Sequence, residues 1–351
     1  MMGAGHVYCL EASSGKTIWK SPFPPSHATP TVDRDRVYVY GSDGRLDCLN
    51  AETGKTVWSK DMQRDLGAGK AGQYGYAASP LVLGDLLLVS ARVDGGALIA
   101  FDKRTGEIKW KARHAGHHQY AFWSSPVVAS IEGVRQIIWL AGPSIVGLNP
   151  TDGTTLWKYE IPPENEKPGC AAATPVVSGN RIVTQYHPPH ARGYTFCLEI
   201  KDGKPKVLWK NRTLANWYFS CVGDKGCLYG IDQKPRNFNR DERDIGNFHC
   251  HDIATGKLLW SIHGFGQSGK RPVRKTRKLN PAGTFVIADG KIISWGHELV
   301  VAEISAKGHN VLSAAELPKR GFRALPVLAG GRLYLRAASG QLMCLDLQEK
   351  K

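Results

Sequence analysis

Histidine is the residue type whose spacing in this chain most resembles a chemical site. His114, His117 and His118 form one cluster, and His187 and His190 flank two prolines in another. Imidazole nitrogens at such spacings can ligate transition metals, but protein metal sites usually add cysteine or carboxylate ligands in a recognisable pattern. Neither cluster has such a partner close by in the sequence. We therefore interpret them as loop histidines and predict no metal site.

Motifs for other common chemistries are also absent from the sequence. It has no Ser-His-Asp elbow, no Gly-rich phosphate loop that opens a helix, and no His-Glu-x-x-His zinc motif. The acidic residues between predicted strands are scattered and lack the paired spacing of a general acid and base; they include Asp65, Asp94, Asp241, Glu242 and Asp244. We name no catalytic residue and expect binding rather than catalysis.

The cysteines follow a structural pattern rather than a redox pattern. Five of the eight occupy one equivalent position of a repeated unit: Cys9, Cys48, Cys197, Cys250 and Cys344. Ala100 and Gly147 stand at this position in other copies, so we interpret it as a slot for small side chains. Cys221 and Cys227 flank a Gly-Asp-Lys-Gly turn, which leaves a disulfide across that hairpin open, subject to its strict geometry.

A short phrase recurs along the chain and indicates which elements position these side chains. It starts with an acidic residue or Asn, usually has Thr or Ser before a Gly, and places Trp four residues after that Gly. Complete copies run from Glu11 to Trp19, Asn50 to Trp58, Asp102 to Trp110, Asn149 to Trp157 and Asp252 to Trp260. A copy with two inserted residues ends at Trp209, and a degenerate copy has Leu312 in place of Trp. A unit of about forty to fifty residues is typical of a propeller, solenoid or array.

Each repeated unit is predicted to contain four strands. In the second copy we expect strands over 28–32, 36–40, 45–50 and 56–60, separated by Gly, Asp and Asn turns. The first strand opens with a proline in most copies, where no ladder hydrogen bond is lost; these residues are Pro30, Pro80, Pro126, Pro175 and Pro326. Four antiparallel strands per unit make a propeller blade. We therefore predict an all-β protein with a β-propeller fold.

Counting the units leaves an incomplete seam. Six units are complete, over 27–60, 77–111, 122–159, 171–210, 216–262 and 282–317. Residues 5–20 hold the last two strands of a unit, and residues 322–347 hold the first three of another. We predict one domain over 1–351 with eight blades and strands missing at the seam; seven blades with a redundant strand is the alternative. Because unpaired edges attract other strands, we expect the natural chain to start upstream of Met1. Unless that edge pairs with another chain, we expect a monomer.

The recurring tryptophan is predicted to hold neighbouring blades together. A sheet cannot bury both of its faces alone, and one large flat side chain per repeat can fill the gap against the next blade. The preceding Gly supplies a left-handed turn residue. We assign this blade-docking role to Trp19, Trp58, Trp110, Trp157, Trp209 and Trp260.

The segment Ala-Glu-Thr-Gly-Lys-Thr-Val-Trp at 51–58 and its copies resemble the tryptophan-docking repeat of quinoprotein-type (PQQ-like) β-propellers. The resemblance covers nearly the whole chain. That superfamily includes PQQ-dependent dehydrogenases and a non-enzymatic, BamB-like branch. Resemblance to the second branch implies a scaffold for a protein partner in the periplasm or another extracytoplasmic compartment. A shared fold does not fix the activity.

Two other functions stay open under this resemblance. The dehydrogenases carry an adjacent Cys-Cys disulfide over the quinone, a calcium ion and a catalytic Asp, and this chain has no adjacent cysteines. We therefore predict no cofactor, and expect PQQ and calcium only if the chain is a divergent PQQ-dependent oxidoreductase. A carbohydrate-binding or lyase-type propeller is the other alternative.

Loop lengths predict which face of the propeller binds a partner. The links over 61–76, 111–121, 160–170, 186–193, 233–247 and 263–280 are long and all belong to one face, whereas the links on the other face are tight. Functional residues concentrate on loops that a rigid scaffold holds. We therefore predict that a protein or other macromolecular partner binds this long-loop face.

Aromatic residues recur on the long-loop face four residues before the first-strand proline or its equivalent, and the links between second and third strands on the same face supply polar contacts. We expect them around the channel mouth, either as packing or as a binding funnel for a flat or extended ligand. They are Tyr76, Arg92, Phe122, Trp123, His187, Arg192, Trp217, Tyr218, Trp295, His297, Phe322 and Arg323.

Charge adds a second candidate contact. The chain has 46 Lys and Arg against 31 Asp and Glu, a net charge of +15 that attracts polyanions. One run within 270–278 concentrates six cations: Lys270, Arg271, Arg274, Lys275, Arg277 and Lys278. It is either a solvated loop or a contact for an anionic partner such as lipid or lipopolysaccharide. Nucleic acid is not expected, because the run lacks stacking aromatics.

Membrane and export signals are not visible in the sequence. No run of eighteen apolar residues could form a transmembrane helix. Residues 1–10 lack the basic start and long apolar core of a signal peptide.

Overall fold

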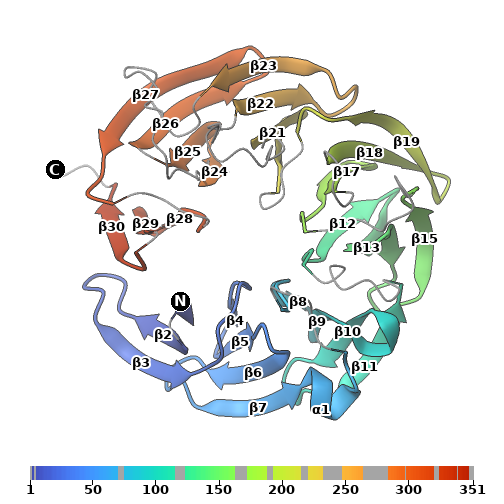
Figure 1. Ribbon diagram of the computed structural model, residues 1–351, viewed down its shortest axis with the longest axis vertical. Helices are drawn as coiled ribbons and strands as arrows, with labels where there is room; N and C mark the ends of the chain where they lie inside the picture. The colour runs from blue at the N-terminus through green and yellow to red at the C-terminus, as the bar shows by residue number, and fades with distance from the viewer. Residues whose placement is uncertain are drawn as a thin grey trace, which may run out of the picture. The chain divides into compact units, whose positions relative to one another are not determined.

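The computed structural model describes residues 2–3, 5–69, 75–114, 123–162, 172–187, 193–214, 220–231, 247–263, 284–296, 298–319, 324–337 and 339–347. Strands dominate these residues (Figure 1). Helical structure within these ranges is limited to α1 (Met62–Leu66) and the 3-10 turn η1 (Val93–Gly95). Over these residues, no helix is long and apolar enough to cross a membrane.

The chain divides into two compact units. The first comprises Met1–Pro175, Tyr186–His190 and Glu199–Lys206, and the second comprises the remaining residues. The single domain that we expected over 1–351 therefore stays a prediction.

The strands of the first unit form four consecutive sheets. The N-terminal sheet contains β1 (Met2–Gly3), β2 (His6–Leu10) and β3 (Thr17–Pro22). The next contains β4 (Thr31–Asp33), β5 (Arg36–Tyr40), β6 (Arg45–Asn50) and β7 (Thr56–Asp61). The third contains β8 (Leu81–Leu83), β9 (Leu86–Ala91), β10 (Ala97–Asp102) and β11 (Ile108–Arg113). The fourth contains β12 (Val127–Ile131), β13 (Val134–Ala141), β14 (Ser144–Leu148) and β15 (Thr155–Glu160).

The remaining strands form four further sheets, mostly in the second unit. They are β16 (Val176–Ser178), β17 (Arg181–Tyr186), β18 (Tyr194–Lys201) and β19 (Lys204–Asn211); then β20 (Val222–Asp224), β21 (Cys227–Ile231), β22 (Asn247–Asp252) and β23 (Leu258–His263). Next come β24 (Thr284–Ala288), β25 (Lys291–Trp295), β26 (Glu298–Ser305) and β27 (Gly308–Glu316). The C-terminal sheet contains β28 (Val327–Ala329), β29 (Arg332–Arg336) and β30 (Leu342–Asp346).

Neighbouring strands in every sheet are consecutive in sequence, as in the blades of a propeller (Figure 1). The predicted all-β propeller with four-stranded antiparallel blades is therefore confirmed. Six sheets are complete with four strands, whereas each end of the chain supplies only a three-stranded sheet. The eight-bladed count was wrong because neither end forms a full blade of its own. Six complete blades, with the partial sheets of the two ends counted as one, correspond to the seven-bladed alternative.

Strand boundaries within a blade follow the sequence closely. β5 and β6 have the predicted bounds, and β7 extends one residue further. β4 starts three residues later than predicted, because the N–H groups before it bond to hydroxyls instead of a ladder. Ala28 N donates to Ser26 Oγ over 2.9 Å, and Thr29 N donates to Ser79 Oγ over 2.9 Å. The N-terminal sheet gains β1, a short strand that we did not predict.

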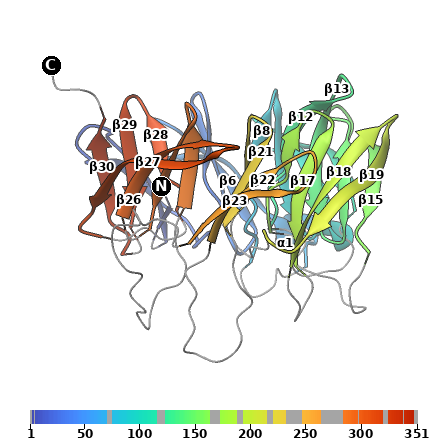
Figure 2. The same cartoon turned by 90° about the horizontal axis from the view of Figure 1, so that it is seen from above.

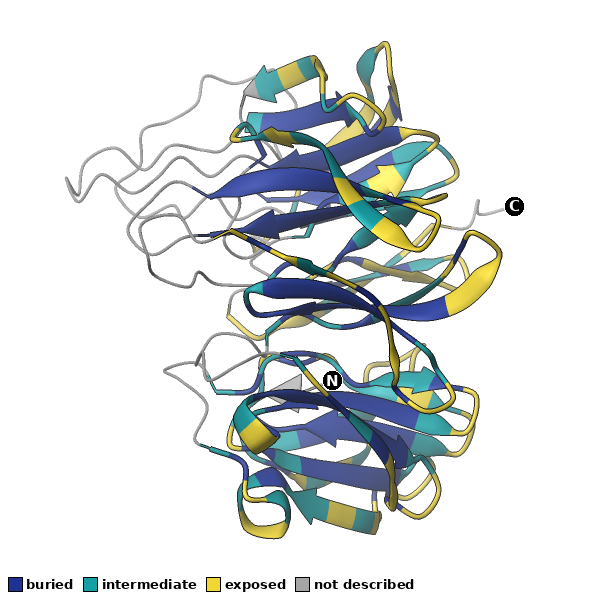
Figure 3. Ribbon diagram, turned by 90° about the vertical axis from the view of Figure 1, so that its right-hand side faces the viewer, coloured by how far each residue is buried: buried dark blue, intermediate teal, exposed yellow. Residues whose placement is uncertain are grey.

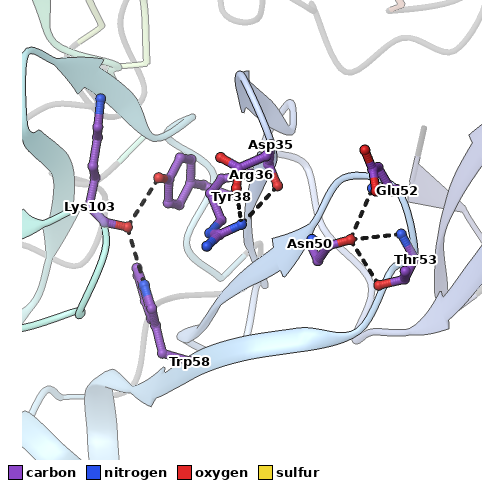
Figure 4. Close-up of polar contacts among 8 residues, drawn as sticks. All are labelled: Asp35, Arg36, Tyr38, Asn50, Glu52, Thr53, Trp58 and Lys103. Carbon is purple, nitrogen blue, oxygen red and sulfur yellow. Dashed lines mark hydrogen bonds and ion pairs between the residues drawn. The ribbon is translucent and has the colours of Figure 1, made fainter.

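The recurring phrase folds into a compact turn (Figure 4). Asn50 Oδ1 accepts hydrogen bonds from Glu52 N at 3.1 Å and from Thr53 N and Thr53 Oγ1, both at 2.9 Å. Gly54 N donates to Asn50 O over 2.9 Å. A side-chain acceptor at the first position satisfies the turn's backbone donors, which explains why Asp, Asn or Glu begins each copy.

Five of the six repeat tryptophans donate their indole N–H to a backbone carbonyl of the following blade. Trp58 Nε1 donates to Lys103 O over 3.2 Å, and Tyr38 Oη donates to the same oxygen over 3.1 Å (Figure 4). The other four bonds are Trp19 to Ala51 O, Trp110 to Pro150 O, Trp209 to Ile253 O and Trp260 to Ser305 O, at 2.8 to 3.2 Å. The indole is thus fixed at both its apolar ring and its polar edge.

The glycine of four of the phrases receives the indole of the preceding blade. A Cβ on Gly153 would lie 2.5 Å from Trp110 Cε3, and one on Gly106 would lie 2.9 Å from Trp58 Cδ2. Equivalent contacts join Gly54 to Trp19 and Gly256 to Trp209. Glycine is therefore required for two reasons: its positive φ in the turn and the room that it leaves for an indole.

Trp157 is the exception among the six. Its Nε1 donates to Gln136 Oε1 over 2.7 Å, within its own blade. The glycine of the next copy, Gly203, has no atom within 4 Å of the Cβ it would carry. That copy contains two inserted residues, and a carboxylate takes over the contact: Glu132 accepts from Asp202 N at 2.8 Å and Gly203 N at 2.9 Å.

Burial is greatest in the middle strands of the blades, and the turns are exposed (Figure 3). In the first unit, Tyr38 and Cys48 from one blade pack in the same apolar cluster as Leu87 and Ile99 of the next. In the second unit, Cys250 and Phe248 share a cluster with Ile292. Packing between successive sheets therefore supplies the core.

Substitution of Gly153 can separate the contribution of its contact with the Trp110 indole from the backbone strain of the turn. Gly153→Ala should lower the free energy of unfolding by about 2–4 kcal/mol, because the methyl group displaces the Trp110 indole as well as straining the turn. Gly133→Ala is the matched control, since Gly133 has φ +77 against +73 for Gly153 but no atom near its Cβ. It should cost only about 1 kcal/mol. Urea unfolding measures both; equal losses would remove the docking role.

Candidate functional site

The described part of the long-loop face in the first unit begins at α1. Asp61 caps this helix by accepting from Gln63 N at 2.9 Å and Arg64 N at 3.0 Å. Figure 2 shows α1 at the opposite end of the first unit from the tip of the β12–β13 hairpin, which is one of the tight turns. The tight links that we predicted on the other face are present after β4, β8, β16 and β24, where two residues connect the strands. In the first unit, the described tight and long links thus lie at opposite ends of the blades.

Tyr76 fastens this loop to its blade. Its side chain is 0% exposed and packs 5.4 Å, centroid to centroid, from Tyr40. Tyr76 N donates to Ser42 O over 3.0 Å, and Tyr76 Oη donates to Gly69 O over 2.8 Å. Burial raises the pKa of the Tyr76 hydroxyl to about 12, so it stays a hydrogen-bond donor at neutral pH. The buried Tyr76 side chain therefore holds the loop in place, and its ring is not accessible to a ligand.

Arg92 and Trp123 lie in two other links and bond to the same loop. Gly69 N donates to Arg92 O over 3.0 Å, and Trp123 Nε1 donates to Gly75 O over 2.9 Å. Gly75 has φ +68, and any Cβ there would collide with Ser42 O, so only glycine fits beneath the indole. Both Arg92 and Trp123 are half-buried. The structure thus brings Tyr76, Arg92 and Trp123 together, a set we call the Trp123 cluster.

The other predicted channel-mouth residues fall into two groups, those that the structure describes and those that it does not. His187 and Trp295 are described and are almost completely buried. Trp295 packs against Leu299, Leu333 and Leu335 of the second unit. The rest lie outside the described residues: Phe122, Arg192, Trp217, Tyr218, His297, Phe322 and Arg323. The basic run of Lys270, Arg271, Arg274, Lys275, Arg277 and Lys278 also lies outside them, as do His117, His118 and His190.

Hydroxyl residues before the first-strand prolines connect neighbouring blades, and our sequence analysis missed them. Thr29 N donates to Ser79 Oγ, and Ser79 N donates to Ser125 Oγ, each over 2.9 Å. Thr31 Oγ1 adds a bond to Pro80 O at 2.6 Å. The signal was available, because Thr or Ser directly precedes Pro30, Pro80, Pro126 and Pro175. These bonds fix the inner strands from which the long loops depart.

A buried histidine pair on β22 was also missed. His249 and His251 alternate along the strand, and their ring centroids are 5.9 Å apart. His251 is fully buried, and its Nδ1 lies 3.0 Å from Gly256 O. Burial lowers the pKa of His251, with the nearby His249 as a smaller cause, so its ring is neutral at pH 7. The His-Cys-His alternation at 249–251 was the available signal.

The described cysteines are free thiols, including Cys221 and Cys227, so the bridge between them that we left open does not form here. The predicted small-residue slot lies opposite the repeat tryptophan, with Cys48 paired to Trp58 and Cys250 to Trp260. Burial raises the pKa of Cys48, Cys221 and Cys250 to about 12. Such thiols are poor nucleophiles at neutral pH.

Over the residues that the structure describes, no group of three or more His, Cys, Asp or Glu side chains could hold a metal ion. The Trp123 cluster offers instead an indole and a guanidinium on a backbone fixed by hydrogen bonds. Indole and guanidinium groups are enriched at protein–protein interfaces.

Comparisons with known proteins agree with this fold. The family described as "Outer membrane protein assembly factor BamB" matches residues 3–262. BamB from Moraxella catarrhalis has a similar structure, with a TM-score of 0.66 at 16% identity over 97% of this chain and 90% of that one. Among curated protein sequences, no significant match to this chain is found.

Enzymes share the fold as well. A quinohemoprotein alcohol dehydrogenase from Comamonas testosteroni gives a TM-score of 0.65 at 15% identity, over 94% of this chain and 67% of that one. A europium-containing methanol dehydrogenase gives 0.61 at 14% identity, over 97% and 78%. At such identities the likeness shows the fold alone.

Thiol reactivity should follow burial. At pH 8, a thiol with a pKa of about 12 is ionised only on the order of one part in ten thousand. Cys344 is exposed, so iodoacetamide should alkylate it at least about tenfold faster than Cys48 or Cys221. Mass spectrometry of tryptic peptides over time measures the rates. Cys344→Ala should remove the fast phase, and labelling of Cys48 at the same rate as Cys344 would refute the assignment.

Stability should fall in mild acid because of His251. Its pKa in the folded protein lies below the ordinary value of 6.5, so the unfolded chain binds the proton more tightly. Its contribution is therefore complete above pH 6.5 and is lost as the pH falls below that value. We expect the urea midpoint to decrease from pH 7 to pH 5, and His251→Asn to reduce that decrease. An unchanged slope in the variant would show that other groups cause it.

Proposed function

The chain belongs to the family of outer membrane protein assembly factor BamB, and we propose that it is a non-catalytic scaffold that binds a protein partner on its long-loop face. The observation that carries this proposal is the Trp123 cluster. Trp123 and Arg92 stay half-exposed while the backbone around them is held by bonds from Tyr76, Gly69 and Trp123 itself.

A fixed backbone favours binding for a physical reason. Immobilising a flexible loop on association reduces affinity, whereas a loop already held in place avoids that loss. The bond from Trp123 to Gly75 links two successive blades, so the surface spans more than one repeat. A partner that contacts both blades would bury the indole at its centre, where tryptophan contributes most to affinity.

The proposal includes the compartment and the class of partner. Family membership supports an extracytoplasmic location, and the name of the matched family supports a partner from the assembly of outer-membrane proteins. The net charge of +15 favours a partner with an acidic surface, or an additional contact with an anionic membrane through the basic run at 270–278.

A divergent quinoprotein oxidoreductase is the second candidate, and its support is the structural likeness to the two dehydrogenases. The residues of this chain fit that chemistry poorly. Its sequence has no adjacent cysteines, and the polar groups of the Trp123 cluster are a guanidinium, a phenol and an indole instead of carboxylates. These groups are donors, whereas calcium requires oxygen acceptors.

Two measurements separate these functions. Titration of the purified protein with PQQ and calcium should give no saturable dye-linked oxidation of alcohols. In parallel, a photo-crosslinking amino acid at Trp123 should capture one discrete partner in cells, and the same group at Asp85, in a tight turn, should not. Saturable turnover would overturn the scaffold function.

The contribution of individual side chains can then be measured against the captured partner. Arg92→Ala and Trp123→Ala should each weaken its binding by about tenfold or more, with Tyr76→Phe as the control that changes the loop but not its exposed groups. Equal binding by all variants would move the interface away from the Trp123 cluster.

A further inference from the structure

Cys227 and Cys250 meet on one face of the sheet β20–β23. They lie on the neighbouring antiparallel strands β21 and β22, where Tyr229 is directly opposite Cys250 and Cys227 stands two residues before Tyr229. Residues two apart on a strand point to the same face of the sheet. The two thiols and the tyrosine hydroxyl interact directly there. The strand register thus places two free thiols side by side within one blade.

An equivalent pair of positions in the first unit shows that this contact follows from the register. Gly147 and Cys250 both stand opposite the repeat tryptophan of their own blade. A Cβ on Gly147 would lie 2.6 Å from Gln136 Oε1. Gln136 stands two residues before the residue opposite Gly147, as Cys227 does relative to Cys250. A side chain at the position of Cys227 therefore reaches the residue in the small-residue slot.

Cysteine at the position of Cys227 distinguishes this blade from three blades of the first unit, which have Arg36, Leu86 and Gln136 there. Cys48 fills the slot of one of these blades, and its thiol lies near the Arg36 guanidinium. A single buried cysteine in the slot is explained by its small size. Small size does not explain a second thiol in contact with it, because longer side chains fit at that position elsewhere.

A bond between the two sulfur atoms would require a small movement of the strands. Diagonal neighbours on an antiparallel pair have Cα atoms about 7–8 Å apart, whereas most disulfides span about 4.4–6.8 Å. A disulfide formed here is therefore strained, and strained disulfides are reduced more easily than structural ones. Such a bond is suited to reversible oxidation.

Cys227 is the thiol that an oxidant reaches first. It is 4% exposed and directly follows the exposed turn residues Lys225 and Gly226, whereas Cys250 is 0% exposed. Local opening at the start of β21 would expose Cys227 without unfolding the rest of the blade. Cys250 lies in the apolar cluster with Phe248 and becomes available to Cys227 from inside.

We propose that Cys227 and Cys250 form a reversible disulfide when the protein meets an external disulfide, either a small molecule or a protein. The Cys227 thiolate attacks the external disulfide, forms a mixed disulfide and releases one thiolate. Cys250 then attacks the Cys227 sulfur and releases the second. Two protein thiols are oxidised, the external disulfide is reduced, and the two protons pass to the released thiolates. This site is separate from the Trp123 cluster, and the inference stands without the function proposed above.

Mass spectrometry of the full chain can identify the bond. The folded protein is incubated with glutathione disulfide, unfolded in urea with N-ethylmaleimide to block the remaining thiols, and digested with trypsin. Cleavage after Lys225 places Cys221 and Cys227 in different peptides. Peptides linked through Cys227 and Cys250 should exceed any other linked pair at least about tenfold, because these thiols are already in contact. An equal amount of linked Cys221 and Cys227, or no linked pair, would overturn the proposal.

Two matched variants show which cysteines form the bond. Cys250→Ala introduces the residue that Ala100 provides at this position of another blade, so the variant should fold and lose the linked pair. Cys48→Ala makes the same change in a different blade and should leave the bond unaffected. Circular dichroism verifies folding of both variants. If Cys227 enters a disulfide to the wild-type extent in Cys250→Ala, the assignment of Cys250 as its partner is wrong.

Reversibility is measured with glutathione. The oxidised protein is incubated with mixtures of reduced glutathione and glutathione disulfide, and the linked peptide is quantified. The bond should be lost in a mixture rich in reduced glutathione, which leaves most structural disulfides intact. Its persistence there would show a permanent crosslink and contradict the proposal. Formation of the bond only in urea would also contradict it, because the folded strands would then hold the thiols apart.

Discussion

The contact between an indole of one blade and a glycine of the next is the interaction on which this structure depends. In two copies a single phrase provides both halves: Gly54 and Gly106 each accept the preceding tryptophan, and Trp58 and Trp110 of the same copies reach the following glycine. Because the indole N–H also bonds to a carbonyl beside that glycine, the distance and the register between blades are both defined. This contact repeats along the first unit, and the second unit contains it once, between Trp209 and Gly256.

Departures from this contact show which part of it can be replaced. At Gly203 the indole is missing, and Glu132 bonds to two backbone N–H groups there. At Gly308 no atom lies within 4 Å of the position that a Cβ would take, although Trp260 Nε1 still donates to Ser305 O. A polar clamp or a remaining hydrogen bond thus preserves contact between sheets where the apolar half has been lost. The repeat tolerates variation because several weak contacts are shared across each boundary.

The sequence predicted the strands better than the contacts among the candidate site residues, and the reason is physical. Strand pattern and turn chemistry act over a few residues, so the bounds of β5 and β6 and the tight turns were correct. The start of β4 was not, because it depends on Ser79, fifty residues away. Likewise, the sequence identified both Trp123 and Tyr76 as candidates, but it could not predict the bond from Trp123 Nε1 to Gly75 O, next to Tyr76. Nor could it predict that Tyr76 is buried whereas Trp123 is only half-buried, because both depend on packing between distant segments. The predicted number of blades was wrong because it depends on the two ends of the chain, where each sheet has only three strands.

Regular repeats also explain where specificity can arise in such a molecule. Positions that recur in most blades, such as the tryptophan and the small residue opposite it, are buried in contacts between blades and are not available to a ligand. Side chains available to a ligand are therefore expected where the repeat pattern is interrupted. Trp123 lies outside the repeat phrase, and its indole N–H bonds to Gly75 O in the link of another blade. This interruption of the repeat gives Trp123 a contact that lies outside its own sheet.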